Sequence, residues 1–233
     1  MNWDRIVNKI KPHIVKIETQ AGDGTGFLLL YNENRTFCGV ATALHVVSHA
    51  DDWQQPIRLR DHSSSQTVLL ESNARAILTD WKTDSAVILF NKGEFPLPAE
   101  PNTLLPSASI IPVGVEVGWL GFPAVAPYDL CFFSGKVSAR QESSNAYLID
   151  GVAINGVSGG PVIHGSTEDG VRIVGAVSAY HANRASGDAL PGLLIAQDVT
   201  HFHGVTGTIR SIDEANRKKA EFESGELQTN IRN

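Results

Sequence analysis

The sequence predicts an all-β protein made of two β-subdomains, and three observations support this. Short β-prone runs separated by Gly, Asn, Asp and Ser recur along the 233 residues, as they do in barrels and sandwiches. Four prolines fall within residues 96–106, where they remove ladder donors and predict an extended connector. Helical periodicity is confined to the two ends of the chain.

The expected elements follow in chain order. In the first subdomain the strands are expected at 13–19, 26–31, 36–41, 56–59, 67–70, 75–78 and 85–90. In the second they are expected at 110–120, 130–138, 146–150, 161–164, 172–180 and 193–199. A short helix is expected before Pro12, and the capping-box pattern at 211–214 predicts a polar helix to about Glu223. The expected boundaries are a first barrel with its leading helix at 1–95, a connector at 96–107, a second barrel at 108–210 and a helical tail at 211–233.

Composition and charge exclude several classes of protein. The formal net charge is −6, from 25 acidic and 19 basic side chains, and basic residues form no extended patch, so we expect no nucleic-acid partner. The chain has no apolar segment of the kind that a signal peptide or a membrane helix needs, so we expect no membrane partner. The two cysteines, Cys38 and Cys131, lie far apart and predict free thiols in a reducing, cytoplasmic setting.

The segment 155–161, Asn-Gly-Val-Ser-Gly-Gly-Pro, carries the strongest chemical signal. A serine hydroxyl becomes a nucleophile only when a base removes its proton and donors stabilise the oxyanion that forms. The flanking glycines allow a sharp turn that aims the N–H groups of Gly156 and Ser158 at one point. The alternative is a glycine-rich hairpin with an incidental serine.

His45 and Asp84 supply the other two parts of a triad. Each context is ordinary when taken alone, since histidines after apolar strands and acids before them are usually structural. Their order along the chain, His45, Asp84 and then Ser158, is one on which the triad geometry is known to arise. The first two fall in the first subdomain and Ser158 in the second, as a site between two barrels requires.

The chain resembles trypsin-like serine peptidases of the chymotrypsin fold, in particular the HtrA/Deg type. The similarity covers roughly residues 13–200 and rests on the segments Gly24-Thr25-Gly26-Phe27, the alanine-rich strand into His45, 80–87, 120–123, 134–138, 150–156 and 175–178. It implies two packed six-stranded antiparallel β-barrels with the active site in the cleft between them. Ser158 would attack the peptide carbonyl, His45 would act as base and acid, Asp84 would orient His45, and the amides of Gly156 and Ser158 would form the oxyanion hole.

The sequence departs from this family at several positions. Val157 stands where digestive members carry the aspartate that pairs with a new N-terminus, and Val46 replaces the usual cysteine after the histidine. We therefore expect no activation by that ion pair. About 20 residues follow the last expected strand, so we expect no PDZ domain and no control by one.

The resemblance also implies a substrate pocket and its preference. Val152, six residues before Ser158, is expected at the base of the S1 pocket, beside a wall formed by Ser178, Ala179, Tyr180, Ile195 and Ala196. Burial of an unpaired Lys or Arg among such residues is costly, so we expect cleavage after small or apolar residues. The expected partners are a protein or peptide substrate and a regulatory protein. No cofactor and no metal are expected, and His201 and His203 are expected to face solvent.

Two other functions remain open at this stage. A pseudoprotease or a latent protease would keep the fold as a binding or signalling module. An esterase would use the same triad, and residues 156–160 match the bare Gly-x-Ser-x-Gly pattern. In α/β-hydrolases, however, the histidine follows the serine and a helix follows the motif.

Overall fold

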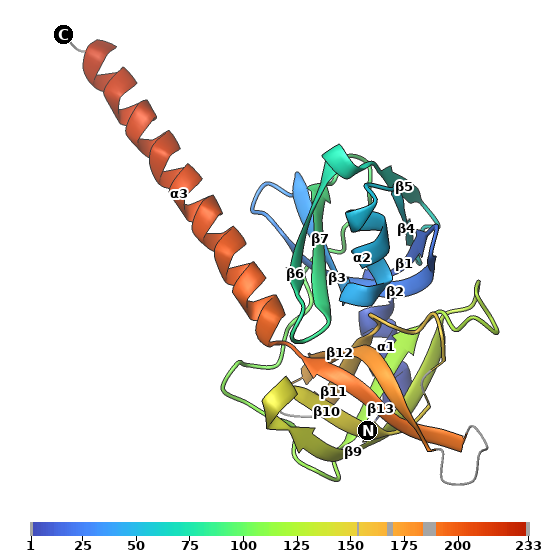
Figure 1. Ribbon diagram of the computed structural model, residues 1–233. Helices are drawn as coiled ribbons and strands as arrows, with labels where there is room; N and C mark the ends of the chain where they lie inside the picture. The colour runs from blue at the N-terminus through green and yellow to red at the C-terminus, as the bar shows by residue number, and fades with distance from the viewer. Residues whose placement is uncertain (1, 153, 167–169, 184–189, 232–233) are drawn as a thin grey trace.

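The structure, a computed structural model, describes residues 2–152, 154–166, 170–183 and 190–231. It consists of two antiparallel β units packed side by side, with a long helix extending away from them (Figure 1). The predicted all-β, chymotrypsin-like fold is confirmed. Within the described residues no helix is both long and apolar enough to cross a membrane.

The first unit is a seven-stranded sheet in the order β5-β4-β1-β2-β3-β7-β6. Its elements are β1 (Ile14–Thr19), β2 (Gly22–Tyr31), β3 (Phe37–Ala43), α2 (Leu44–Asp52), β4 (Ile57–Asp61), β5 (Thr67–Leu70), η2 (Ser72–Ala74), β6 (Arg75–Asp80) and β7 (Ser85–Asn91). The sheet is not the closed six-stranded barrel that was expected, because its edge strands β5 and β6 do not pair. The Arg75 guanidinium spans that edge and donates to the carbonyls of Leu70 at 2.7 Å and Ala50 at 3.1 Å.

The second unit is a closed barrel in the order β10-β13-β12-β11-β8-β9. Its elements are β8 (Glu116–Gly121), β9 (Cys131–Gln141), η3 (Glu142–Ser144), β10 (Ala146–Asp150), β11 (Pro161–Ser166), β12 (Gly170–Asn183) and β13 (Leu190–Asp198). Between β7 and β8 the chain is extended and touches the second barrel through a bridge from Leu104 to Ile173. Trp119 is fully buried inside this barrel, stacked on Phe133 with ring centroids 6.0 Å apart.

The N-terminal helix joins the first unit to the second. Helix α1 (Trp3–Ile10) and the 3₁₀ turn η1 (Lys11–His13) lead into β1, yet the Trp3 indole donates to Glu116 on β8 at 2.9 Å. The Trp3 ring also lies 5.0 Å from that of Phe132. The main hydrophobic cluster contains residues of both units, among them Phe27 and Trp119. One continuous core therefore fixes the two units relative to each other.

The C-terminal helix differs from the prediction. Helix α3 spans Thr200–Ile231 and starts well before the expected residue 211. The Asp198 carboxylate accepts the Thr200 N–H at 2.9 Å and caps the helix, directly after β13. His201 and His203 do not simply face solvent as expected, because they hydrogen-bond to the carbonyls of Leu78 and Leu105.

Phe202 anchors the start of α3, and its removal tests this. Its ring is fully buried and packs edge-on against Phe27 of β2, with centroids 5.7 Å apart. Phe202→Ala should lower the free energy of unfolding by about 3–5 kcal/mol, measured by urea denaturation. Phe222, on the same helix, is 67% exposed, so Phe222→Ala serves as the matched control and should leave stability within about 0.5 kcal/mol. Equal effects of the two changes would contradict this packing.

Candidate active site

The Asp84 carboxylate holds His45 at the seam between the two units. β3 ends at Ala43, so His45 lies in the first turn of α2, and Asp84 lies in the turn before β7. Asp84 Oδ1 accepts the His45 N–H at 2.9 Å, and Oδ2 lies 2.8 Å from His45 Nδ1. The Asp84 carbonyl also accepts the Leu44 N–H at 2.9 Å. Asp84 therefore satisfies the start of helix α2 and orients the imidazole in one arrangement.

The backbone of Asp84 adopts a conformation that few side chains accept. Its φ of +46° lies in the left-handed region, which Asp and Asn tolerate better than most residues. An ordered acid in such a conformation is typical of a functional site. The turn thus directs the carboxylate toward the ring instead of into solvent.

Ser178 of β12 contributes a second hydrogen bond to this carboxylate. Its hydroxyl donates to Asp84 Oδ2 at 2.5 Å, across the seam between the units. Burial raises the pKa of Asp84, but the hydrogen bonds from His45 and Ser178 outweigh burial and hold that pKa below its ordinary value of 3.8. Asp84 is therefore ionised at neutral pH, as an acceptor for an imidazolium must be.

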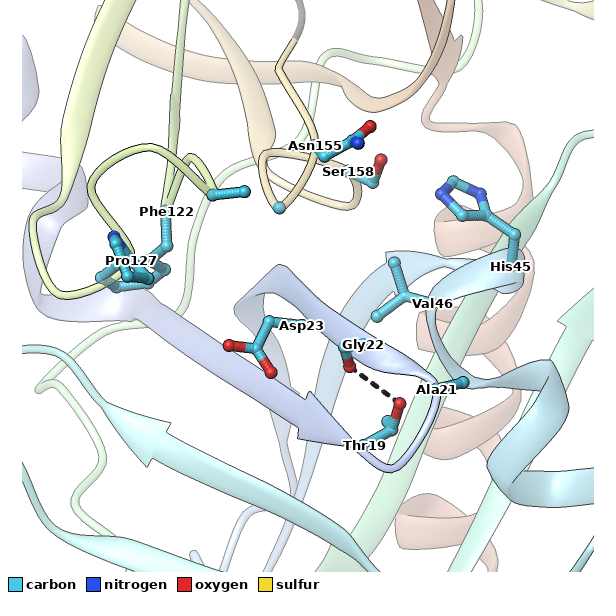
Figure 2. Close-up of a pocket in the computed structure, with 12 residues that line it drawn as sticks. Thr19, Ala21, Gly22, Asp23, His45, Val46, Phe122, Pro127, Asn155 and Ser158 are labelled. Atoms are coloured by element: carbon cyan, nitrogen blue, oxygen red, sulfur yellow. Dashed lines mark hydrogen bonds between the residues drawn. The ribbon is translucent and has the colours of Figure 1, made fainter.

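Ser158 lies opposite His45 at one end of a cavity of about 550 Å³. Figure 2 shows Ser158 and the His45 ring facing each other there, with Asp23 and Phe122 further along the cavity. No hydrogen bond joins the Ser158 hydroxyl to His45, both of which are described residues. Such contacts are often long in free enzymes and tighten when substrate binds.

The turn before Ser158 leaves two N–H groups available. The Asn155 carbonyl accepts the Ala124 N–H at 2.7 Å, and the Val157 carbonyl accepts the Gly160 N–H at 2.9 Å. Because a trans peptide directs its N–H away from its carbonyl, the N–H groups of Gly156 and Ser158 point away from these partners. Neither donates to an acceptor among the described residues. Two such donors are what an oxyanion requires.

Five of the residues expected for the S1 pocket lie on the paired strands β12 and β13, but the six differ in exposure. Val152 is 44% exposed and Ala179 is exposed, whereas Ala196 is buried in the barrel core. Ile195 is partly buried and pairs with Ala179, and the backbone of Tyr180 pairs with Leu194. The sixth residue, Ser178, contacts Asp84. The cavity beside Ser158 is lined by the β1–β2 turn and by none of these six residues.

Sequence reasoning missed several residues that line this cavity. They are Thr19, Ala21, Gly22, Asp23, Val46, Phe122, Ala124, Pro127 and Asn155. The turn that supplies the first four is closed by a hydrogen bond from the Thr19 hydroxyl to the Gly22 carbonyl at 2.8 Å (Figure 2). Within the described part of the chain, no group of three His, Cys, Asp or Glu side chains is arranged to hold a metal ion.

Two β units with a histidine, an acid and a serine at their seam form the architecture of a serine endopeptidase. Residues 24–175 match the trypsin-like peptidase domain, and the chain therefore belongs to the trypsin-like peptidase family and is a serine endopeptidase. The resemblance to trypsin-like serine peptidases found in the sequence motifs is confirmed. A comparison with curated protein sequences gives no significant match.

Several solved structures share the fold at low sequence identity. The inactive form of the Rv3671c protease of M. tuberculosis is 19% identical over 88% of this chain and 92% of its own, with a TM-score of 0.60. A serine endoprotease from Yersinia pestis is 16% identical over 90% of this chain and 66% of its own, with a TM-score of 0.65. Deg5 is 21% identical over 84% and 88%, with a TM-score of 0.59.

Removal of the Ser178 hydroxyl tests its hydrogen bond to Asp84. Among the described residues, Ser178→Ala leaves His45 as the only side-chain partner of the Asp84 carboxylate, so the ring is held less firmly. Because a hydrogen bond to a charged group contributes about 1.5–3 kcal/mol, we expect kcat/KM to fall roughly 10- to 100-fold. Ser178→Thr keeps the hydroxyl and should retain more activity. Unchanged peptide hydrolysis by Ser178→Ala would contradict this role.

The low pKa of Asp84 gives a second prediction, for the pH–rate profile. A carboxyl whose pKa is below 3.8 stays ionised throughout about pH 5–8, so it adds no titration there. The acid limb of log kcat/KM should therefore have a slope of one. The stability that this carboxylate contributes is complete above 3.8 and is lost only as the pH falls through its lower folded value. A slope of two above pH 5 would contradict the assignment.

Proposed function

We propose that this serine endopeptidase cleaves peptide bonds with Ser158 as nucleophile, His45 as general base and Asp84 as the orienting acid. The observation that carries the proposal is the contact between His45 Nδ1 and Asp84 Oδ2 at 2.8 Å, beside a cavity lined by both His45 and Ser158. A cavity of about 550 Å³ beside Ser158 has room for the side chains of a protein or peptide substrate.

The proposed mechanism assigns one step to each group. With Nδ1–H donating to Asp84, His45 Nε2 accepts the proton of the Ser158 hydroxyl as its oxygen attacks the substrate carbonyl. The carbonyl oxygen becomes an oxyanion that the N–H groups of Gly156 and Ser158 bind. The imidazolium then gives its proton to the leaving amine, and water hydrolyses the acyl-enzyme by the same steps.

We extend the proposal to substrate preference, with cleavage after small or apolar residues. Val152, Ala179 and Ile195 are at least partly accessible, and none of the six expected pocket residues is acidic. A lysine or arginine side chain would find no carboxylate partner among them. Cleavage of a peptide library, read by mass spectrometry, tests this, and a preference for basic P1 residues would contradict it.

The cellular setting is also part of the proposal. We place the protein in the cytoplasm, with no nucleic-acid or membrane partner and with a regulatory protein controlling its activity. The Cys38 thiol is buried, which raises its pKa to about 12, and Cys131 is also free, as suits a reducing compartment. The net charge of −6 does not favour nucleic acid. Cell fractionation tests the location, and full activity of the purified chain alone would remove the need for a regulator.

The experiment that tests the catalytic assignment is fluorophosphonate labelling followed by intact-mass spectrometry. We expect a single adduct on the wild type and none on Ser158→Ala, because only an activated serine reacts. His45→Ala should abolish labelling as well, while both variants keep the wild-type melting temperature within a few degrees. A wild type that takes up no label would indicate a latent site or a binding module on a protease fold.

A further inference from the structure

Thr25 links the first unit to both residues that form the candidate oxyanion hole. It lies on β2 and is fully buried between the units. Its hydroxyl donates to the Gly156 carbonyl at 2.7 Å and accepts the Phe122 N–H at 3.0 Å. Its own N–H donates to the Ser158 carbonyl at 2.9 Å. One residue thus contacts the turn on each side of Val157.

The Gly156 carbonyl belongs to the one peptide in this turn whose oxygen is held by a side chain. The carbonyls of Asn155 and Val157 accept backbone N–H groups, which every substitution except proline leaves in place. The Gly156–Val157 peptide depends on the Thr25 hydroxyl, although the Val157 N–H also donates to the Ile154 carbonyl at 3.1 Å. The hydrogen bond from the Thr25 side chain is therefore the contact to this turn that a conservative substitution can remove.

Gly156 makes that support necessary. Its φ of +92° is easily reached by glycine, which is also free to leave it, and a Cβ there would lie 2.3 Å from the Phe122 carbonyl oxygen. Rotation about Gly156 would turn its N–H away from the substrate and a carbonyl toward it. An oxyanion hole stabilises charge only when its donors are already aligned before the reaction.

We infer that Thr25 is a positioning residue that keeps the Gly156 and Ser158 N–H groups aligned for the oxyanion. The inference rests on the proposed function. The hydroxyl touches neither substrate nor Ser158, so it acts on the transition state through the turn that it holds. This role differs from a contribution to packing alone. Loss of the hydroxyl leaves both the Gly156 carbonyl and the Phe122 N–H without their partner in a buried place. Because unpaired polar groups there cost free energy, a rearranged turn becomes more favourable than before.

The test compares Thr25→Val, which keeps the shape and loses the hydroxyl, with Thr25→Ser, which keeps the hydroxyl. For Thr25→Val we expect kcat to fall about 10- to 100-fold with KM within about twofold, less than the loss of a donor itself. Affinity for a peptide aldehyde, whose adduct places an oxyanion in the hole, should fall by the same factor. Affinity for an uncleaved peptide, measured in the Ser158→Ala background, should not change. Thr25→Ser should restore most of kcat.

Phe202→Ala provides the control for loss of stability alone. It removes packing from Phe27, two residues from Thr25 on the same strand, without touching the turn. Below its melting temperature it should bind the aldehyde as the wild type does. A Thr25→Val variant with wild-type kcat would overturn the inference. So would a variant whose kcat, peptide affinity and melting temperature all decline together, as a structural role predicts. A wild type that is not labelled by fluorophosphonate would instead overturn the proposed function.

Discussion

The carboxylate of Asp84 is the constraint on which the site depends. It accepts hydrogen bonds from the backbone and ring of His45 and from the hydroxyl of Ser178. Asp84 lies in the turn before β7, and its donors come from the start of α2 and from strand β12 of the second unit. One ionised group therefore fixes a helix start, the direction of an imidazole and the seam between two β units. These hydrogen bonds lower the pKa of Asp84 despite its burial.

The serine side of the seam is held by neutral groups instead. The Thr25 N–H donates across the seam to the Ser158 carbonyl, and within the second unit the N–H groups of Gly159 and Val177 donate to the carbonyls of Val177 and Gly160. Val157, which stands where digestive relatives carry an aspartate, is fully buried, and Gly121 packs against it. The turn is thus ordered by apolar packing, by backbone hydrogen bonds and by the Thr25 hydroxyl, and the uncharged Val157 cannot form the ion pair that the aspartate forms in those relatives.

The sequence predicted the fold class and most strands because alternation and turn residues are local signals. It also predicted which residues the geometry brings together at the seam, from the contexts of His45, Asp84 and Ser158; their catalytic roles stay predictions. The bond from Ser178 to Asp84 has no local signal, since it joins residues 94 positions apart. Helix α2 was missed because apolar residues around His45 read as a strand end. The early start of α3 was hidden by Gly204 and Gly207, which lower helix propensity, while the anchor Phe202 acts through tertiary packing.

The two ends of the chain lie in different surroundings, and this decides how the protein is best handled. Trp3 is hydrogen-bonded to Glu116 at the start of β8, so a tag fused just before it would lie against the second barrel (Figure 1). Helix α3 has 32 residues, about 48 Å at 1.5 Å per residue. Asp213 and Arg217 still contact Glu33 of the first unit, and the helix beyond them leads away from both units (Figure 1). It forms a built-in spacer. Immobilisation through the far end of that spacer would hold both β units, and the cleft between them, away from the support.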